Sequence, residues 1–189
     1  MDSFLVSTGL VAVAEIGDKT QLLALLLAAR FRRPMPIICG ILVATLANHA
    51  LAGFAGQWAG SLVQGPWLRW GVGLSFLAMG AWALVPDRLD ADDAPPPLLG
   101  AGAFVATLVC FFLAEMGDKT QVATILLAAR LDGLAWIVLG TTIGMMIANA
   151  PVVLCGHALA GRVPARAVRR VAAVLFMVLG AAVLLGWTG

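Results

Sequence analysis

Residues 14–30 read AEIGDKTQLLALLLAAR, and residues 114–130 read AEMGDKTQVATILLAAR. The two stretches are identical at 12 of 17 positions and lie one hundred residues apart. Each carries a glutamate, an aspartate and a lysine inside a long apolar segment. The repetition predicts a chain built from two copies of one unit, with the charged motif in the same place in both.

The composition indicates a membrane protein. Of the 189 residues, 61% are hydrophobic and only 12% are charged, whereas a soluble domain of this size needs more charge to cover its surface. The class predicted is therefore an all-α polytopic membrane protein. A net charge of +2, with no basic run interleaved with aromatic residues, excludes nucleic acid as a partner. The three cysteines (Cys39, Cys110 and Cys155) lie in apolar runs and are predicted to be free thiols.

Six apolar segments mark the candidate membrane spans. They cover approximately residues 4–29, 35–59, 67–85, 99–129, 134–157 and 168–187. A transmembrane helix takes roughly 20 residues, so the first and fourth segments are too long for one simple span. Both contain the charged motif, and we expect each to be bent or unwound at Gly17 or Gly117.

One charged, proline-rich stretch divides the chain. Residues 86–97 read PDRLDADDAPPP, a composition typical of a solvated linker. We predict a first three-span repeat at 1–86, an acidic cytoplasmic linker at 87–97 and a second three-span repeat at 98–189. Because three is odd, the second copy must cross the bilayer in the opposite direction. Inverted repeats of this kind are typical of secondary transporters, whose binding site lies near the midplane.

The arginines indicate the orientation in the membrane. With the N-terminus outside, only Arg69 and Arg130 lie in extracytoplasmic loops, and the cytoplasmic loops carry the other eight: Arg30, Arg32, Arg33, Arg88, Arg162, Arg166, Arg169 and Arg170. This distribution satisfies the positive-inside rule. Both termini are then extracytoplasmic. The N-terminal stretch has no basic region of the kind that signal peptides carry, so it is expected to remain in the mature protein.

The repeated motif supplies the candidate site. Glu15 and Asp18 share one face of a helical turn, and so do Glu115 and Asp118, so a pseudo-two-fold arrangement of the halves would bring the four carboxylates together. Amide side chains nearby are candidate secondary ligands: Gln21, Gln121, Asn48 and Asn149, the two asparagines falling one residue out of register. The rest of the motif is expected to support the site: Gly17, Lys19, Thr20, Gly117, Lys119 and Thr120.

The charge of the two motifs limits the chemistry. An unpaired carboxylate in a membrane costs about 2.5 kcal/mol or more, and four carboxylates with two lysines leave a residual charge of minus two. One divalent cation or two protons would balance it, which is the simplest arrangement for a cation/proton exchanger. Oxygen ligands favour Mg²⁺, Ca²⁺ or Mn²⁺, and the two histidines, His49 and His157, are expected to be packing residues. Each lysine could pair with a carboxylate in the empty state or extend along the wall as a structural residue.

The motif resembles that of a known family. Glu-x-Gly-Asp-(Lys/Arg)-(Thr/Ser), present twice in a chain of two times three spans, is similar to the Gdt-type cation/proton exchangers. The resemblance covers the whole chain, and no motif position departs from the pattern. It implies that the acidic residues bind Mn²⁺ or Ca²⁺, exchanged for protons without a cofactor. It also implies that a chain this short is a manganese exporter of a bacterial inner membrane; charge counting alone gives neither the metal nor the direction.

Other functions are compatible with the acidic motif. A small cationic metabolite, such as a basic amino acid, could occupy the same pocket and be exported. An intramembrane metal-dependent enzyme could use paired carboxylates, although it would need no inverted duplicate, and a passive channel would conduct poorly through so acidic a constriction. The small-residue pairs Gly40-x-x-x-Ala44 and Gly140-x-x-x-Gly144 permit close helix contact, within a monomer or between the subunits of a homodimer.

Overall fold

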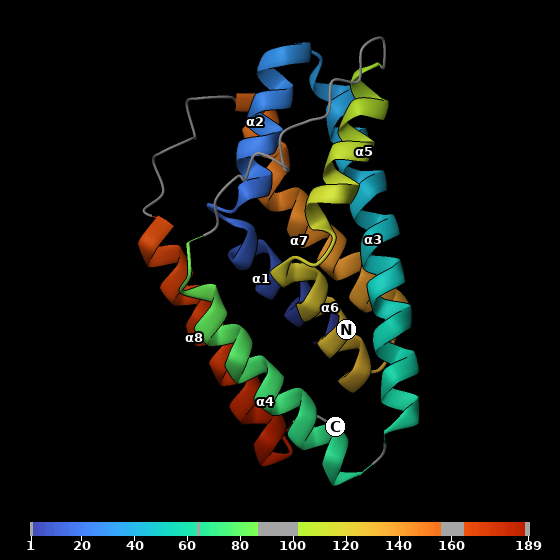
Figure 1. Ribbon diagram of the computed structural model, residues 1–189, viewed down its shortest axis with the longest axis vertical. Helices are drawn as coiled ribbons and strands as arrows, with labels where there is room; N and C mark the ends of the chain where they lie inside the picture. The colour runs from blue at the N-terminus through green and yellow to red at the C-terminus, as the bar shows by residue number, and fades with distance from the viewer. Residues whose placement is uncertain (1, 64, 87–101, 156–164, 188–189) are drawn as a thin grey trace.

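The computed structural model describes residues 2–63, 65–86, 102–155 and 165–187. Within these ranges all regular secondary structure is α-helix (Figure 1), as the composition predicts. The linker predicted at 87–97, Arg162 and His157 lie outside the described residues. The helices are α1 (Asp2–Glu15), α2 (Lys19–Phe31), α3 (Pro34–Leu62), α4 (Pro66–Ala83), α5 (Ala103–Glu115), α6 (Lys119–Arg130), α7 (Leu134–Cys155) and α8 (Ala165–Leu185).

Both long apolar segments are broken at the charged motif, as the sequence predicts. α1 ends at Glu15 and α2 begins at Lys19, while α5 ends at Glu115 and α6 begins at Lys119. Gly17 and Gly117 adopt positive φ values of 81° and 78°, a backbone conformation that glycine adopts without a steric cost. The glycine therefore turns the chain between the two helices of each pair.

Among the described residues, three helices are long and apolar enough to cross a membrane alone: α3, α7 and residues Arg166–Leu185 of α8. The helices on either side of each break have only 12 to 14 residues, about 20 Å at 1.5 Å per residue, so each is too short for a hydrocarbon core of about 30 Å. Large apolar side chains such as Leu51, Phe54 and Trp58 are exposed along α3, which is typical of a surface that contacts lipid. All three cysteines are free; Cys110 is buried, whereas Cys39 and Cys155 are exposed.

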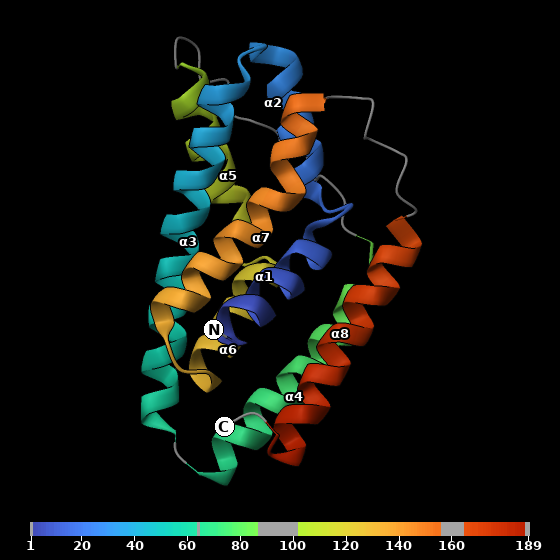
Figure 2. The same ribbon diagram turned by 180° about the vertical axis from the view of Figure 1, so that it is seen from behind.

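The broken helix of each half packs against the intact helix of the other. α1 and α2 lie against α7, whereas α5 and α6 lie against α3 (Figures 1 and 2). Small residues allow this contact, since a Cβ on Gly40 would lie 2.9 Å from the carbonyl oxygen of Phe104, and one on Gly140 would lie 2.7 Å from that of Phe4. These small-residue positions therefore serve packing within one chain.

α4 and α8 form a tight antiparallel pair. A Cβ on Gly80 would lie 3.0 Å from the carbonyl oxygen of Ala173, and one on Gly180 would lie 2.9 Å from that of Gly73. The small residues therefore let the two helices approach closely at both points.

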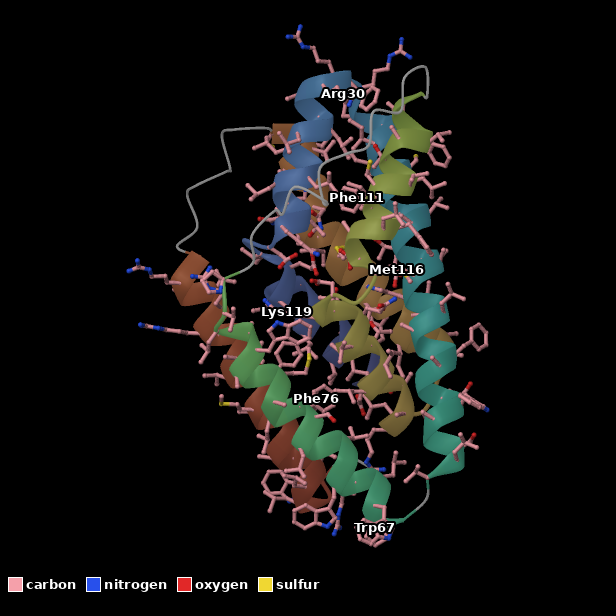
Figure 3. The ribbon with its side chains drawn as sticks, in the orientation of Figure 1. Arg30, Trp67, Phe76, Phe111, Met116 and Lys119 are labelled. Carbon is pink, nitrogen blue, oxygen red and sulfur yellow. The ribbon has the colours of Figure 1, made fainter. Side chains whose placement is uncertain are left out.

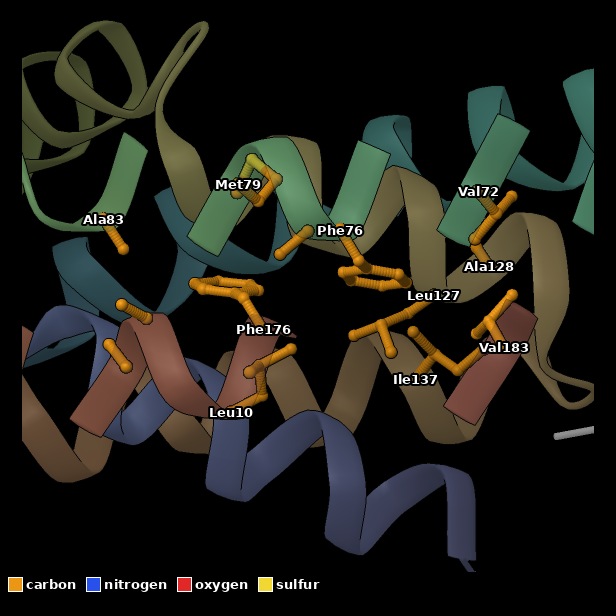
Figure 4. Close-up of a cluster of buried hydrophobic side chains, with 13 residues drawn as sticks. Leu10, Val72, Phe76, Met79, Ala83, Leu127, Ala128, Ile137, Phe176 and Val183 are labelled. Carbon is orange, nitrogen blue, oxygen red and sulfur yellow. The ribbon is translucent and has the colours of Figure 1, made fainter. Parts of the chain in front are cut away.

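The buried apolar residues form two cores, one at each end of the bundle. The first, here called the α4–α8 core, joins that pair to α1, α6 and α7 and includes Phe76 and Phe176, whose rings stack with centroids 6.4 Å apart (Figure 4). The second, the α2–α5 core, joins α2, α3, α5 and α7 and includes Leu27, Ile41 and Phe111. The α4–α8 pair contributes to the first core and not to the second, so it packs toward one end of the molecule.

Candidate cation-binding site

Three carboxylates from the two halves meet at the helix breaks. Glu15 ends α1 and Glu115 ends α5, and both side chains are 0% exposed. Together with Asp118, which is 6% exposed, each offers a carboxylate oxygen within 4.8 Å of the other two. The sequence predicts that the duplicated motif forms one cluster across the repeats, and these three residues do so.

The fourth predicted member, Asp18, lies outside this group. Its Oδ2 accepts a hydrogen bond from the backbone N–H of Thr20 at 3.4 Å and caps the N-terminus of α2, a role that aspartate fills well. The carboxylate lines a small pocket that Lys119 and Arg169 also line. Asp118 begins α6 without such a capping bond. The two motifs thus share their backbone conformation, with φ −80° at Asp18 and φ −76° at Asp118, and differ in what the aspartate side chain contacts.

The motif threonines hold the glutamates in place. Thr20 Oγ1 donates to Oε2 of Glu15 at 2.7 Å, and Thr120 Oγ1 donates to Oε2 of Glu115 at 3.1 Å. Each bond spans a helix break, so it fixes the end of one helix to the start of the next. The sequence identified these threonines only as neutral oxygens; their spacing of five residues from the glutamate, across a glycine turn, is the signal that could have revealed them as donors.

The second oxygen of each glutamate has no such donor. Oε1 of Glu15 and Oε1 of Glu115 are buried and accept no hydrogen bond within the described part of the chain. A buried carboxylate oxygen without a donor is expensive, and native proteins rarely leave one unsatisfied. A proton or a cation would satisfy each of these two oxygens.

The glutamines close the breaks and connect the halves. Oε1 of Gln21 accepts from the backbone N–H of Gly17 at 2.9 Å, and Oε1 of Gln121 accepts from that of Gly117 at 2.6 Å. Their amide groups reach the opposite repeat, Gln21 Nε2 donating to the carbonyl oxygen of Ala148 and Gln121 Nε2 to Oδ1 of Asn48. The glutamine oxygens, expected as secondary ligands, are thus engaged by backbone groups.

The two candidate asparagines are not equivalent. The glutamine contacts make Ala148, rather than Asn149, the structural counterpart of Asn48, so Asn149 corresponds to His49. Nδ2 of Asn48 donates to the carbonyl oxygen of Phe112 at 3.3 Å, and its Oδ1 is taken by the glutamine. Asn149 donates to the carbonyl oxygen of Met145, while its own Oδ1 is buried without a hydrogen-bond partner among the residues described.

Lys119 is held at the end of α4. Figure 3 labels Lys119 close to α4. The Nζ of this lysine donates to the carbonyl oxygen of Val85 at 3.3 Å and lies 5.8 Å from the centre of the Trp82 ring, a cation–π distance. The lysine is only 6% exposed. Sequence reasoning missed Trp82, Val85 and Arg169, because no local pattern connects these positions with the motif.

The arrangement suits a hard divalent cation. Three carboxylate oxygens within 4.8 Å of one another lie close enough together for small side-chain movements to bring each of them to about 2.4 Å from one ion, the usual Ca²⁺–oxygen distance. Within the described residues the cluster contains no thiolate or imidazole, the ligands that Zn²⁺ and Cu²⁺ favour. Bound here, the cation would replace the missing hydrogen-bond donors of the two glutamates.

Sequence comparisons agree with this chemistry. Residues 3–91 and 103–188 match the family described as "Divalent cation/proton antiporter GDT1". The chain is 48% identical to a "Putative manganese exporter" of Vibrio cholerae, over 96% of this chain and 90% of that protein. It is 28% identical to GDT1-like protein 5 of Arabidopsis thaliana, over 95% of this chain and 94% of that protein. No solved structure matches.

Proposed function

The chain belongs to the GDT1 family of divalent cation/proton antiporters, and from this premise we propose that it exports Mn²⁺ from the cytoplasm in exchange for protons. The family resemblance seen in the motif is thereby confirmed. A cation/proton antiporter is a transporter and not an enzyme, so the enzymatic alternative is set aside. Manganese and the outward direction are supported by the name of the Vibrio cholerae relative.

The observation that carries the proposal is the pair of unsatisfied glutamate oxygens. Oε1 of Glu15 and Oε1 of Glu115 are buried without a donor, in a cluster completed by Asp118. Protons satisfy these oxygens in one state of the exchanger, and Mn²⁺ satisfies them in the other. Because both occupants use the same atoms, they exclude each other, and this competition couples the two fluxes.

The remaining predicted ligands have different roles in this proposal: ligand, entry residue or positioning residue. Asn149 has a buried, unengaged carbonyl oxygen and is the favoured additional ligand. Asp18 is the first carboxylate that a cation meets in the adjoining pocket. Gln21 and Gln121 position the glycine turns, and Asn48 positions Gln121.

We place the chain across a bacterial inner membrane with six crossings. In this arrangement α1 with α2, and α5 with α6, each make one crossing that is broken at the midplane. Non-helical backbone within the hydrocarbon region of the bilayer must face protein or a water-filled cavity. The breaks here face the carboxylate cluster. Three exposed arginines lie at the end of α2, Arg30 in its last turn and Arg32 and Arg33 just after it, and this end is on the cytoplasmic side. Both termini are then extracytoplasmic, and residues 1–86 and 98–189 are the inverted repeats.

The size of the cluster argues against a metabolite as cargo. Three carboxylate oxygens within 4.8 Å of one another surround a single ion closely. A basic amino acid would need room for its backbone and side chain beside the ammonium group. The expected cargo is therefore a bare ion, with Ca²⁺ as the alternative to Mn²⁺.

Reconstituted transport tests the proposal. Purified protein in liposomes, with a pH gradient imposed, should transport Mn²⁺, which a fluorescent reporter inside the liposomes detects. Protons should move in the opposite direction. Ca²⁺ should compete with Mn²⁺, and excess arginine or lysine should not. Asp132→Asn, at an exposed position remote from the motif, is the matched control and should transport normally. Competition by the amino acids, or Mn²⁺ movement without protons, would contradict the proposal.

A further inference from the structure

The position of the α4–α8 pair breaks the symmetry of the two repeats. Within the described residues, α4 packs against α6 and α8 packs against α1, whereas α2 makes no comparable contact with α8. Both views show the pair beside α1 and α6 and away from the far ends of α2 and α5 (Figures 1 and 2). In the proposed orientation, α1 and α6 are the extracytoplasmic halves of the broken helices. The pair therefore covers the carboxylate cluster from the extracytoplasmic side.

A small pocket lies beside the motif, where the α4–α8 pair meets the break between α1 and α2. The small pocket lined by Asp18, Lys119 and Arg169 reaches the motif, and Arg169 belongs to the arginine-rich start of α8 on the proposed cytoplasmic side. Ala83 of α4 and Phe176 of α8 line the same pocket. Among the described residues the α4–α8 pair covers the cluster only from the extracytoplasmic side, so the structure fits a cytoplasm-facing state. The pair also forms one wall of this pocket.

The repeats also indicate what the opposite state looks like. Exchanging the roles of two inverted repeats converts one state of such a transporter into the other. In the opposite state, α4 and α6 would take the relative position that α8 and α2 have in this structure. Because α8 lies apart from α2, α4 would then lie apart from α6. The contact of Lys119 with α4 exists only while α4 lies against α6, so it would be lost in the extracytoplasm-facing state.

The aromatic partner of Lys119 occurs in only one repeat. Trp82 corresponds to Ala182 at the constant offset of one hundred residues, so Lys19 has no tryptophan at the matching position of α8. A cation–π contact with Trp82 therefore stabilises one of the two states and has no counterpart in the other. An asymmetric contact shifts the population of two otherwise pseudo-equivalent states.

We propose that the α4–α8 pair is the moving gate of this antiporter, and that Trp82, through its contact with Lys119, holds the gate in the cytoplasm-facing position. This inference rests on the proposed function for the direction of transport. Trp82 is a positioning residue, since it touches the lysine and not the carboxylate cluster. A cation that enters past Asp18 weakens this hold, because it repels the ammonium group of Lys119 from the site and from the ring beside it.

A single-cysteine reporter tests the gate. Ala123 of α6 is fully buried in the α4–α8 core and becomes exposed to the extracytoplasmic side when the pair leaves α6. In a background with Cys39, Cys110 and Cys155 replaced by serine, the thiol of Ala123→Cys is labelled in right-side-out vesicles with a membrane-impermeant maleimide. Because the labelling rate follows the population of the minor state, it reports any shift directly.

Substitutions at Trp82 supply the comparison. Trp82→Ala introduces the residue that the other repeat has at this position. We expect it to raise the labelling rate about tenfold, which corresponds to a free-energy change of about 1.4 kcal/mol between the two states. A partly desolvated cation–π contact contributes a free energy of this order. Trp82→Phe keeps an aromatic face and should raise the labelling rate less than about threefold. Since Trp82 is 39% exposed, removing it opens no core cavity. Equal rates in all three proteins would overturn the proposal.

A second reporter separates gating from loosening of the fold. Ala44 of α3 is fully buried in the α2–α5 core, and the thiol of Ala44→Cys should stay unlabelled in every Trp82 variant. Labelling of both reporters to the same extent would mean general unfolding and would also refute the gate. The measurement uses resting protein without a gradient, so a failure to transport Mn²⁺ would refute the proposed function and leave the labelling result intact.

Discussion

Replacing Glu115 with glutamine removes one charge from the cluster without changing its size. Three carboxylate oxygens lie within 4.8 Å of one another. At that distance two unit charges interact by about 3.5 kcal/mol at an effective dielectric constant of 20. A divalent cation that contacts the oxygens lies closer and carries twice the charge. Loss of one carboxylate should therefore weaken binding by at least about 2.7 kcal/mol, a hundredfold in Kd.

Thermal unfolding in detergent measures this loss. At a Mn²⁺ concentration 100 times the wild-type Kd, binding stabilises the folded protein by about 2.7 kcal/mol, which raises Tm by about 5 to 10 °C for a chain of this length. With a hundredfold weaker Kd, the same concentration stabilises Glu115→Gln by only about 0.4 kcal/mol, a shift of about 1 to 2 °C. Asp132→Asn should keep the full shift. A variant Glu115→Gln that Mn²⁺ stabilises as much as wild type would refute the assignment of this residue to the site.

Three further substitutions test how the site is built. Gly117→Ala forces a residue with a Cβ into φ +78°, which should cost about 1 to 2 kcal/mol and lower Tm. Gly9→Ala is the control, because a Cβ there has no neighbouring atom within 4 Å. This control should leave Tm unchanged or slightly higher. Gly56→Ala would bring a Cβ to 2.2 Å from the carbonyl oxygen of Ile125, so it should cost about 1 to 3 kcal/mol and lower Tm relative to the same Gly9 control. Thr20→Val keeps the shape but removes the 2.7 Å hydrogen bond to Glu15; transport should fall severalfold while the chain still folds, and unchanged Mn²⁺ transport would show that the threonine has no role.

The sequence predicts the parts of this site that depend on local structure. An identical motif in two copies gives the same glycine turn twice, so the breaks at Gly17 and Gly117 and the burial of the adjacent glutamates follow from the repeat. The convergence of Glu15 and Glu115 also follows, because two breaks at one depth of a bundle face each other.

The asymmetry of the site depends on tertiary packing and could not be predicted. The motifs do not reveal that Asp18 caps a helix while Asp118 joins the cluster, nor that Lys119 contacts Trp82. Both differences accompany the one-sided position of the α4–α8 pair, which packs against only one end of the bundle. Two copies of one motif acquire different environments when a third element covers only one of them.

The central claim is that both repeats build one binding site. Its most direct test is the rate of Mn²⁺ transport in liposomes under an imposed pH gradient, for wild type, Glu15→Gln and Glu115→Gln. Because the two glutamates belong to one cluster, either single substitution is expected to abolish transport. If each variant instead keeps about half of the wild-type rate, the two halves bind and transport the cation separately, and a single shared site is contradicted.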